Sequence, residues 1–249
     1  MLNRWIAAFT LATGCLALGA CQTQVFLPAE MQAVQTPIAA YHAYERSDCA
    51  TVERLTDEDA LEVWKRNEMR HSMKLLYGFC REISGDLSAA EAIYRQLVDE
   101  APSSFAADDA AERIRIFKLT TNDPGYARWA ASALDRVDPS MVNRKPIERV
   151  PVRFPPLAES AGIEGYAVVE FGVSDQGTTK NPVVVDSNPP LLFDGASVRA
   201  VRRWRFERQT QTGPTSRQLI RLLFRPDGQI AAGEEPAASN PMSSPARAN

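Results

Sequence analysis

Histidine and cysteine are scarce in this chain, whose 249 residues include two histidines and four cysteines. His42 and His71 form no recognisable ligand spacing with the cysteines, which argues against a metal site. The chain also lacks the G-x-S-x-G, H-E-x-x-H and phosphate-loop patterns of common catalytic and nucleotide-binding sites. Its acidic clusters, at residues 57–59 and at Asp108 and Asp109, have no companion ligands and are typical of the first turns of helices. We therefore expect a protein that is not an enzyme and holds no cofactor.

The N-terminal segment lacks an apolar run long enough to cross a bilayer. Its apolar stretch at residues 5–20 is shorter than the roughly 20 residues required, and its length is typical of a signal peptide. Arg4 supplies the positive charge that precedes such a stretch. The stretch ends in Leu18-Gly19-Ala20-Cys21, which resembles the bacterial lipobox. This resemblance implies a lipoprotein signal peptide at residues 1–20 and lipidation of Cys21; an ordinary secretory signal and an uncleaved anchor are the alternatives.

The residue after the lipidation site bears on where the chain is held. Gln22 stands where an aspartate would resemble an inner-membrane retention signal, so we expect a lipid anchor in the outer membrane and a periplasmic protein. Once the signal peptide and the lipidated cysteine are set aside, Cys49 and Cys80 are the remaining thiols. Because the periplasm is oxidising, we expect a disulfide between them, and two buried free thiols are the alternative.

Changes in composition divide the rest of the chain into four parts. A polar, proline-punctuated tether is expected at residues 21–37, and a helical domain at residues 38–140. Residues 146–226 change to valine-rich alternation with turns, which predicts a second domain containing strands. Residues 227–249 are rich in alanine, serine, proline and glycine, and we expect a disordered tail there.

A faint repeat lies in the helical part, at residues 76–102. Gly78, Ala90, Tyr94 and Pro102 fall on the spacing of one tetratricopeptide unit. In that unit, small residues let two helices approach, the aromatic ring fills the gap, and the proline ends the second helix. Lys74 stands where the usual tryptophan would be. The region resembles a tetratricopeptide-like domain, and an unspecified helical bundle is the alternative.

The second domain shows a fixed order of short elements. A helix opened by Phe154 and Pro155 precedes a strand at residues 166–173, a turn at residues 175–177 and a return strand at residues 182–187. A helix at residues 193–203 and a strand at residues 217–224 follow. This order, with the Arg-Arg-Trp-Arg-aromatic signature at residues 202–206, resembles the C-terminal domain of the TonB family. The resemblance implies an α+β fold, in which the helical domain is followed by a three-stranded antiparallel sheet packed on two helices.

The signature belongs to an arginine-rich stretch, VRAVRRWRF, at residues 198–206. Nucleic acid is not the expected partner, because the chain is predicted to be exported and lacks an aromatic-rich surface on which bases could stack. In the family, this stretch ends the helix that packs on the sheet, which implies that Trp204 and Phe206 are core residues. The arginines would then form a solvated helix face. The functional alternative is a contact with peptidoglycan peptides or lipid headgroups through these arginines: Arg199, Arg202, Arg203 and Arg205.

The resemblance also implies a function. TonB-like domains bind a short extended segment of outer-membrane receptors by strand addition, at the edge formed by the last long strand. That edge is expected at five residues, namely Arg217, Gln218, Leu219, Ile220 and Arg221. A typical family member has a transmembrane helix and a long proline-rich spacer, in whose place this chain has a predicted lipoprotein signal and a helical domain. TonB-dependent transport, through receptors or other envelope proteins, is one hypothesis, and a scaffolding lipoprotein without energy transduction is the other.

Overall fold

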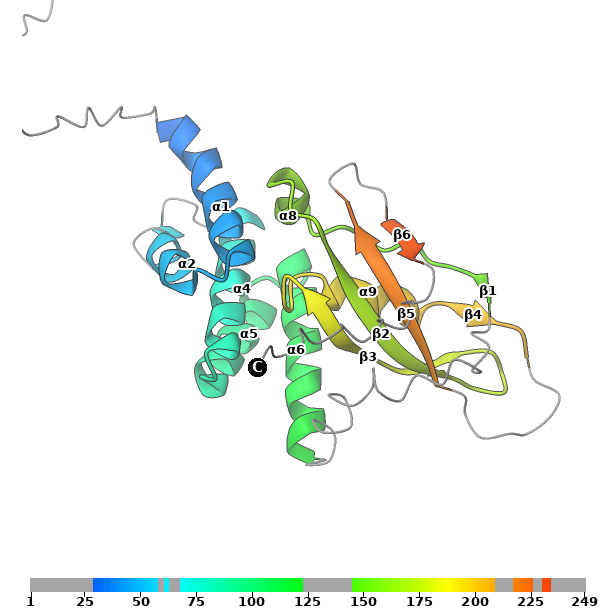
Figure 1. Cartoon of the computed structure of the whole chain (residues 1–249). Helices are drawn as coiled ribbons and strands as arrows, with labels where there is room; N and C mark the ends of the chain where they lie inside the picture. Colours follow the sequence, from blue (N-terminus) through cyan, green and yellow to red (C-terminus); the bar gives the residue numbers. More distant parts are fainter. Residues whose placement is uncertain are drawn as a thin grey trace, which may run out of the picture.

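A computed structural model describes residues 29–57, 61–62, 68–122, 145–208, 217–225 and 230–233, and shows a helical part beside a mixed α/β part (Figure 1). The helices are α1 (Ala29–Glu45), α2 (Cys49–Leu55), α4 (Glu68–Ile83), α5 (Leu87–Glu100), α6 (Phe105–Asn122), α8 (Pro156–Ser160) and α9 (Asp194–Arg202). The strands are β1 (Pro146–Glu148), β2 (Gly165–Val173), β3 (Thr179–Asn188), β4 (Arg205–Phe206), β5 (Arg217–Phe224) and β6 (Ile230–Gly233). None of the described helices is long and apolar enough to span a bilayer.

The helical part is built around the predicted close approach of α4 and α5. A side chain at Gly78 would meet the Tyr94 ring, with Cβ 2.6 Å from Cε1, so a glycine is needed where the two helices pack. Gly85, with φ of 87°, makes the turn between them, and the Asp86 side chain accepts a hydrogen bond from Ala89 N at the start of α5. The helical part of the prediction is therefore confirmed, and α6 extends it as a third helix packed on α5.

Helix α1 begins inside the segment predicted as a tether. It starts at Ala29 and continues through Pro37, which cannot donate a helical hydrogen bond. Ala40, Tyr41 and Tyr44 in its second half are all buried in the core. This packing outweighs the helix-breaking effect of the proline, so the prediction of a tether up to residue 37 was wrong from Ala29 onward. The predicted signal peptide and Cys21 lie outside the described residues.

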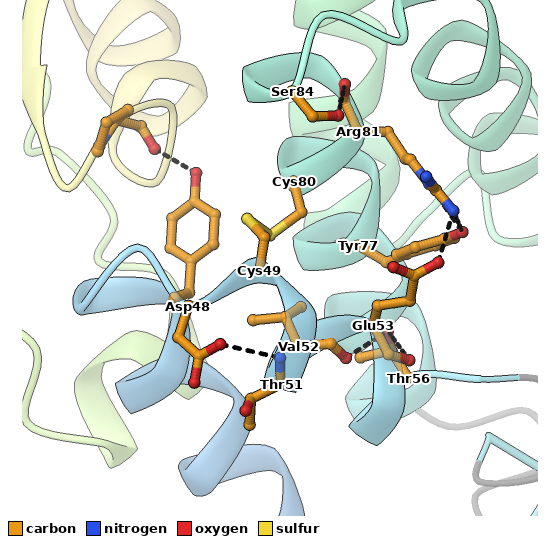
Figure 2. The surroundings of a disulfide bond; sticks show 12 residues. Asp48, Cys49, Thr51, Val52, Glu53, Thr56, Tyr77, Cys80, Arg81 and Ser84 are labelled. Atoms are coloured by element: carbon orange, nitrogen blue, oxygen red, sulfur yellow. Dashed lines mark hydrogen bonds and ion pairs between the residues drawn. A yellow bond between two sulfur atoms is a disulfide. The ribbon is translucent and has the colours of Figure 1, made fainter.

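Cys49 and Cys80 form the predicted disulfide, which joins α2 to α4 (Figure 2). Their Cα atoms are 5.5 Å apart, and 31 residues separate them in sequence. Helix α2 has a polar cap, because the Asp48 side chain accepts a hydrogen bond from Thr51 N at 3.0 Å. The disulfide thus fixes a short helix that buries only Val52 within its own length.

The mixed part contains an antiparallel sheet of strand order β3-β2-β5-β6. Helix α9 packs on β3 and β2, and the ring of Phe193 stacks on that of Phe224 with 4.1 Å between centroids. Trp204 and Phe206 are both 2% exposed, and Trp204 Nε1 donates to Val150 O at 3.1 Å. These two aromatic residues are core residues, as predicted. The α+β fold class is likewise confirmed. The main sheet has four described strands where three were expected, and β1 and β4 form a separate two-stranded sheet.

Candidate functional site

Strand β5 pairs along its whole length with β2, from Arg217 opposite Gly172 to Phe224 opposite Gly165, without a bulge. Its sequence alternates on this ladder, so that Leu222 and Phe224 are buried at 1% exposure on the core side. Ile220 lies on the same face and packs against the core. With one face buried and one edge paired to β2, the second backbone edge of β5 is the candidate binding feature.

Strand β6 covers part of that second edge. Arg221, Leu222, Leu223 and Phe224 pair with β6, which belongs to the segment predicted to be a disordered tail. The prediction was wrong for these four tail residues, because an Ile-Ala-Ala-Gly segment gains its stability from an available edge rather than from its own strand propensity. Within the described chain, residues 217–220 pair with β2 alone. Four of the five predicted partner-strand residues therefore lie on a half-edge that no other described strand covers, called here the open half-edge, and Arg221 pairs with β6.

The side chains around this half-edge differ from one another. Gln218 is buried at 5% exposure, and its Nε2 has no hydrogen-bond partner in the described structure. Leu219 and Arg221 are on the opposite face, where the Arg221 guanidinium lies 3.9 Å from the centroid of the Tyr166 ring. Burial raises the pKa of Tyr166, and a hydrogen bond with Asp186 adds to the rise. The open half-edge thus includes a buried side chain, Gln218, with an unpaired amide nitrogen in the described structure.

The opposite edge of the sheet, formed by β3, is obstructed. Pro182 has no backbone N–H and interrupts the donors of this strand. Its carbonyl oxygen accepts a hydrogen bond from Arg115 Nη2 of α6, at 2.9 Å. Arg115 of the helical domain therefore contacts the β3 edge, and residues 217–220 of β5 lie on the other side of the sheet order.

Two of the four arginines predicted as an anion contact are used inside the molecule. Arg199 pairs with Asp109, and Arg202 Nη2 lies 2.9 Å from Glu112 Oε2. Both carboxylates belong to α6, so these arginines hold the helical domain on α9. Arg203 and Arg205 are exposed, as Arg202 is, and Arg205 Nη1 donates to Trp204 O at 3.1 Å.

Other contacts between the domains were not foreseen from the sequence. Arg113 of α6 pairs with Glu82 of α4 and lies 3.6 Å from Asp194 of α9. The Tyr44 hydroxyl of α1 donates to Pro190 O at 2.5 Å. A usable signal was the spacing of Asp109 and Glu112, three residues apart like the arginines that they meet, which places each pair on one helix face.

Asp108 and Asp109 were predicted to lie in the first turn of a helix, and of the two only Asp108 lies in the first turn of α6. Asp109 is 2% exposed, whereas its neighbour Asp108 is exposed. Burial raises the pKa of Asp109 to about 6, although the Arg199 guanidinium opposes the rise. A side chain at Gly195, in the first turn of α9, would collide with the Asp109 carboxylate. Asp109 is thus a buried interdomain contact rather than a surface charge.

The described residues contain no group of three or more histidine, cysteine or acidic side chains that could hold a metal ion. A hollow of about 810 Å³ lies in the helical domain between α4 and the end of α5. Glu68, His71, Glu100 and Ser104 are among its lining residues. It holds no arrangement of nucleophile, base and oxyanion donors, so the sheet edge is the candidate site that the described geometry favours.

Comparison with known proteins identifies the second domain. Residues 150–226 match the family described as Gram-negative bacterial TonB protein C-terminal. The chain is 32% identical over 81 residues to protein TonB of Pseudomonas aeruginosa, covering 32% of this chain and 24% of that protein. It is 30% identical over 76 residues to protein TonB of Escherichia coli K12, covering 30% of each. Residues 150–226 are therefore a TonB C-terminal domain.

The matched relatives cover about a third of this chain. A third relative, protein TonB of Klebsiella pneumoniae, is 33% identical over 82 residues, or 33% of this chain and 32% of the relative. The chain thus spans about a quarter to a third of the length of these curated relatives. The solution NMR structure of the Pseudomonas aeruginosa TonB CTD is 28% identical and covers 35% of this chain and 88% of that chain, with a TM-score of 0.27.

Proposed function

We propose that this chain acts in TonB-dependent transport across the cell envelope, as a binding protein rather than an enzyme. Its TonB C-terminal domain would capture an extended segment of an outer-membrane receptor or of another envelope protein. The observation that supports this most directly is the open half-edge of β5 at residues 217–220. A strand added there gains main-chain hydrogen bonds, which demand little of the partner's sequence.

The position of β6 sets the length of segment that can bind without rearrangement. A four-residue segment can pair with residues 217–220 while β6 stays in place. A longer segment has to displace β6. This strand competes weakly, because it pairs with β5 through only four residues. The exchange is chemically balanced, because the incoming backbone replaces the hydrogen bonds that β6 gives up.

We propose the periplasm as the location, with the chain held by lipid at Cys21, in the outer membrane. Support comes from the lipobox-like sequence, whose residues lie outside the described structure. Mass spectrometry of the membrane-extracted N-terminus should find acyl groups on Cys21 and no trace of residues 1–20. An intact Met1 on the mature protein would contradict lipidation.

Two neighbouring proline substitutions test strand addition with an internal control. Backbone N–H groups of adjacent strand residues point to opposite sides, so Leu219→Pro and Ile220→Pro remove donors from opposite edges of β5. The variant that loses the outward donor should stay folded and lose capture of synthetic peptides taken from extended segments of outer-membrane receptors. Leu219→Ala and Ile220→Ala should weaken capture only modestly. The proposal fails if both proline variants are folded and bind every peptide as the unmodified chain does.

A scaffolding role is the second candidate, and the charged contacts between α6 and α9 favour it. They hold a helical domain directly on the TonB C-terminal domain, so that each domain could bind its own envelope partner. Exposed Arg203 and Arg205 could add a contact with peptidoglycan. Co-purification of the full chain with the proton-driven inner-membrane motor would favour energy transduction. Co-purification with outer-membrane proteins alone would favour the scaffold.

A further inference from the structure

The contact between α6 and α9 joins buried carboxylates to arginines that are partly exposed. Glu112 meets two arginines, Arg115 and Arg202, and is thereby neutralised. Glu82 and Asp194 share a single cation, Arg113, which is hydrogen-bonded to Glu82 and lies 3.6 Å from Asp194. Negative charge is therefore in local excess on the Asp194 side of the interface.

Asp194 is poorly compensated in its ionised form. It is 5% exposed, and its Oδ1 has no hydrogen-bond partner in the described part of the chain. An ionised carboxylate oxygen without a donor is costly to bury, whereas a protonated carboxyl is neutral. The groups that face it are Arg113, Glu112 and Asp109 from α6, Glu82 from α4, Ser187 from β3 and Tyr44 from α1.

Asp109 is the second buried carboxyl of the interface. It is pressed against the first turn of α9, where Gly195 leaves just enough room for it. The groups that face it are Arg199 and Asp194 from α9, Asp108 from its own helix and Tyr41 from α1. Arg199 alone therefore favours the ionised form of Asp109, whereas burial and two acidic neighbours favour the protonated form.

We propose that the α6–α9 interface is a proton-linked clamp, which holds the helical domain on α9 when Asp109 and Asp194 are protonated and loosens when they ionise. Opening the clamp frees Arg199 and Arg202 on α9 and removes Arg115 from the β3 edge. The clamp is independent of which partner binds β5.

The direction of the linkage follows from burial. Burial raises the pKa of Asp109 and the pKa of Asp194 from 3.8 to about 6 each, and the facing arginines oppose the rise. In the open state both carboxyls regain water and their ordinary pKa, so the closed state binds protons more tightly. Closing is therefore favoured as the pH falls, and this advantage is lost as the pH rises through about 6. Between pH 7.5 and pH 5 the closing constant should rise about tenfold for each carboxyl.

Hydrogen exchange on the full chain, corrected for the intrinsic pH dependence of amide exchange, measures this opening. The open state through which amides of α6 and α9 exchange should be less populated at pH 5 than at pH 7.5. Amides of β2 should exchange only through global unfolding, which is rarer. Asp109→Asn should lower the ratio of the closing constants at pH 5 and pH 7.5 about tenfold. The double variant Asp109→Asn with Asp194→Asn should abolish the pH dependence. Asp108→Asn, at the exposed neighbouring position, should leave it unchanged.

Three outcomes would overturn the clamp. Interface amides that open equally often at both pH values would show that no proton is linked to closing. Interface amides that open only together with β2 would show that the domains do not separate before unfolding. A pH dependence that is the same in Asp109→Asn and in the unmodified chain would assign the linkage to other groups. The first two readouts need no variant, so a variant that fails to fold leaves the proposal testable.

Discussion

The two edges of the sheet are handled in opposite ways. At β3, Pro182 lacks a donor, and its carbonyl is bonded to Arg115 of the helical domain. At β5, the tail strand β6 covers residues 221–224 and leaves residues 217–220 without a second partner strand in the described chain. Exposed sheet edges can pair with other chains through their unpaired backbone N–H and C=O groups. In the described chain, such unpaired backbone at β5 is limited to residues 217–220. Among the described residues, Arg115 of the helical domain is bonded to β3 at one edge, whereas no described strand covers residues 217–220 at the other.

The largest expected effect is a loss of stability of the whole sheet, which would disrupt both of its edges. Trp204→Ala removes a buried ring and its hydrogen bond to Val150 O, and should lower the free energy of unfolding by about 3–5 kcal/mol. Urea denaturation measures the change, with Arg203→Ala at the exposed neighbouring position as a control expected within about 0.5 kcal/mol of the unmodified chain. Unchanged stability together with loss of a partner would show that Trp204 is a binding residue instead.

The next effect concerns the helical domain alone. Reduction of Cys49–Cys80 releases a 31-residue loop and should destabilise this domain by about 3–4 kcal/mol in the chain-entropy account. Amides of α2 and α4 should then exchange faster, whereas those of β2 and β5 should change little. Alkylation without reductant should label neither cysteine. Quantitative labelling of both in natively purified protein would rule the bond out.

A smaller effect is expected when the contact of Arg115 with the β3 edge is removed, because the β3 edge would then be less covered and the difference between the two edges would be smaller. Arg115→Met keeps much of the side-chain volume and loses the hydrogen bonds to Pro182 O and Glu112. The loss of charge-assisted hydrogen bonds should destabilise the docked arrangement by about 1–3 kcal/mol. Amides of β3 should exchange faster, while those of residues 217–220 should keep their rates. If β3 stays as protected as before, Arg115 does not cover that edge.

The elements of the TonB C-terminal domain were predictable because each has a local signal. The predicted strand at residues 217–224 coincides with β5, since its alternation of buried and outward residues is maintained over eight residues. The turn before β3 was marked by Gly177, whose φ is 76°. The aromatic residues of the RRWRF signature lie in the core, where the resemblance placed them.

The features that escaped prediction depend on contacts between distant segments. Strand β6 has four small or apolar residues without alternation, and its pairing is decided by the free edge of β5. The burial of Asp109 depends on α9, 90 residues away, and a pair of adjacent aspartates looks the same in sequence whether exposed or buried. The sequence therefore predicted the strand that carries the candidate site. It did not predict that β6 pairs with half of its outer edge.

One measurement tests strand addition most directly. The amides of residues 217–220 are followed by hydrogen exchange in the full chain, before and after addition of a synthetic peptide from an extended segment of an outer-membrane receptor. We predict that the amides of β5 that point away from β2 become protected, and that protection of β6 falls when the peptide is longer than four residues. A peptide that binds the chain and leaves all of these amides unchanged would contradict capture at this edge.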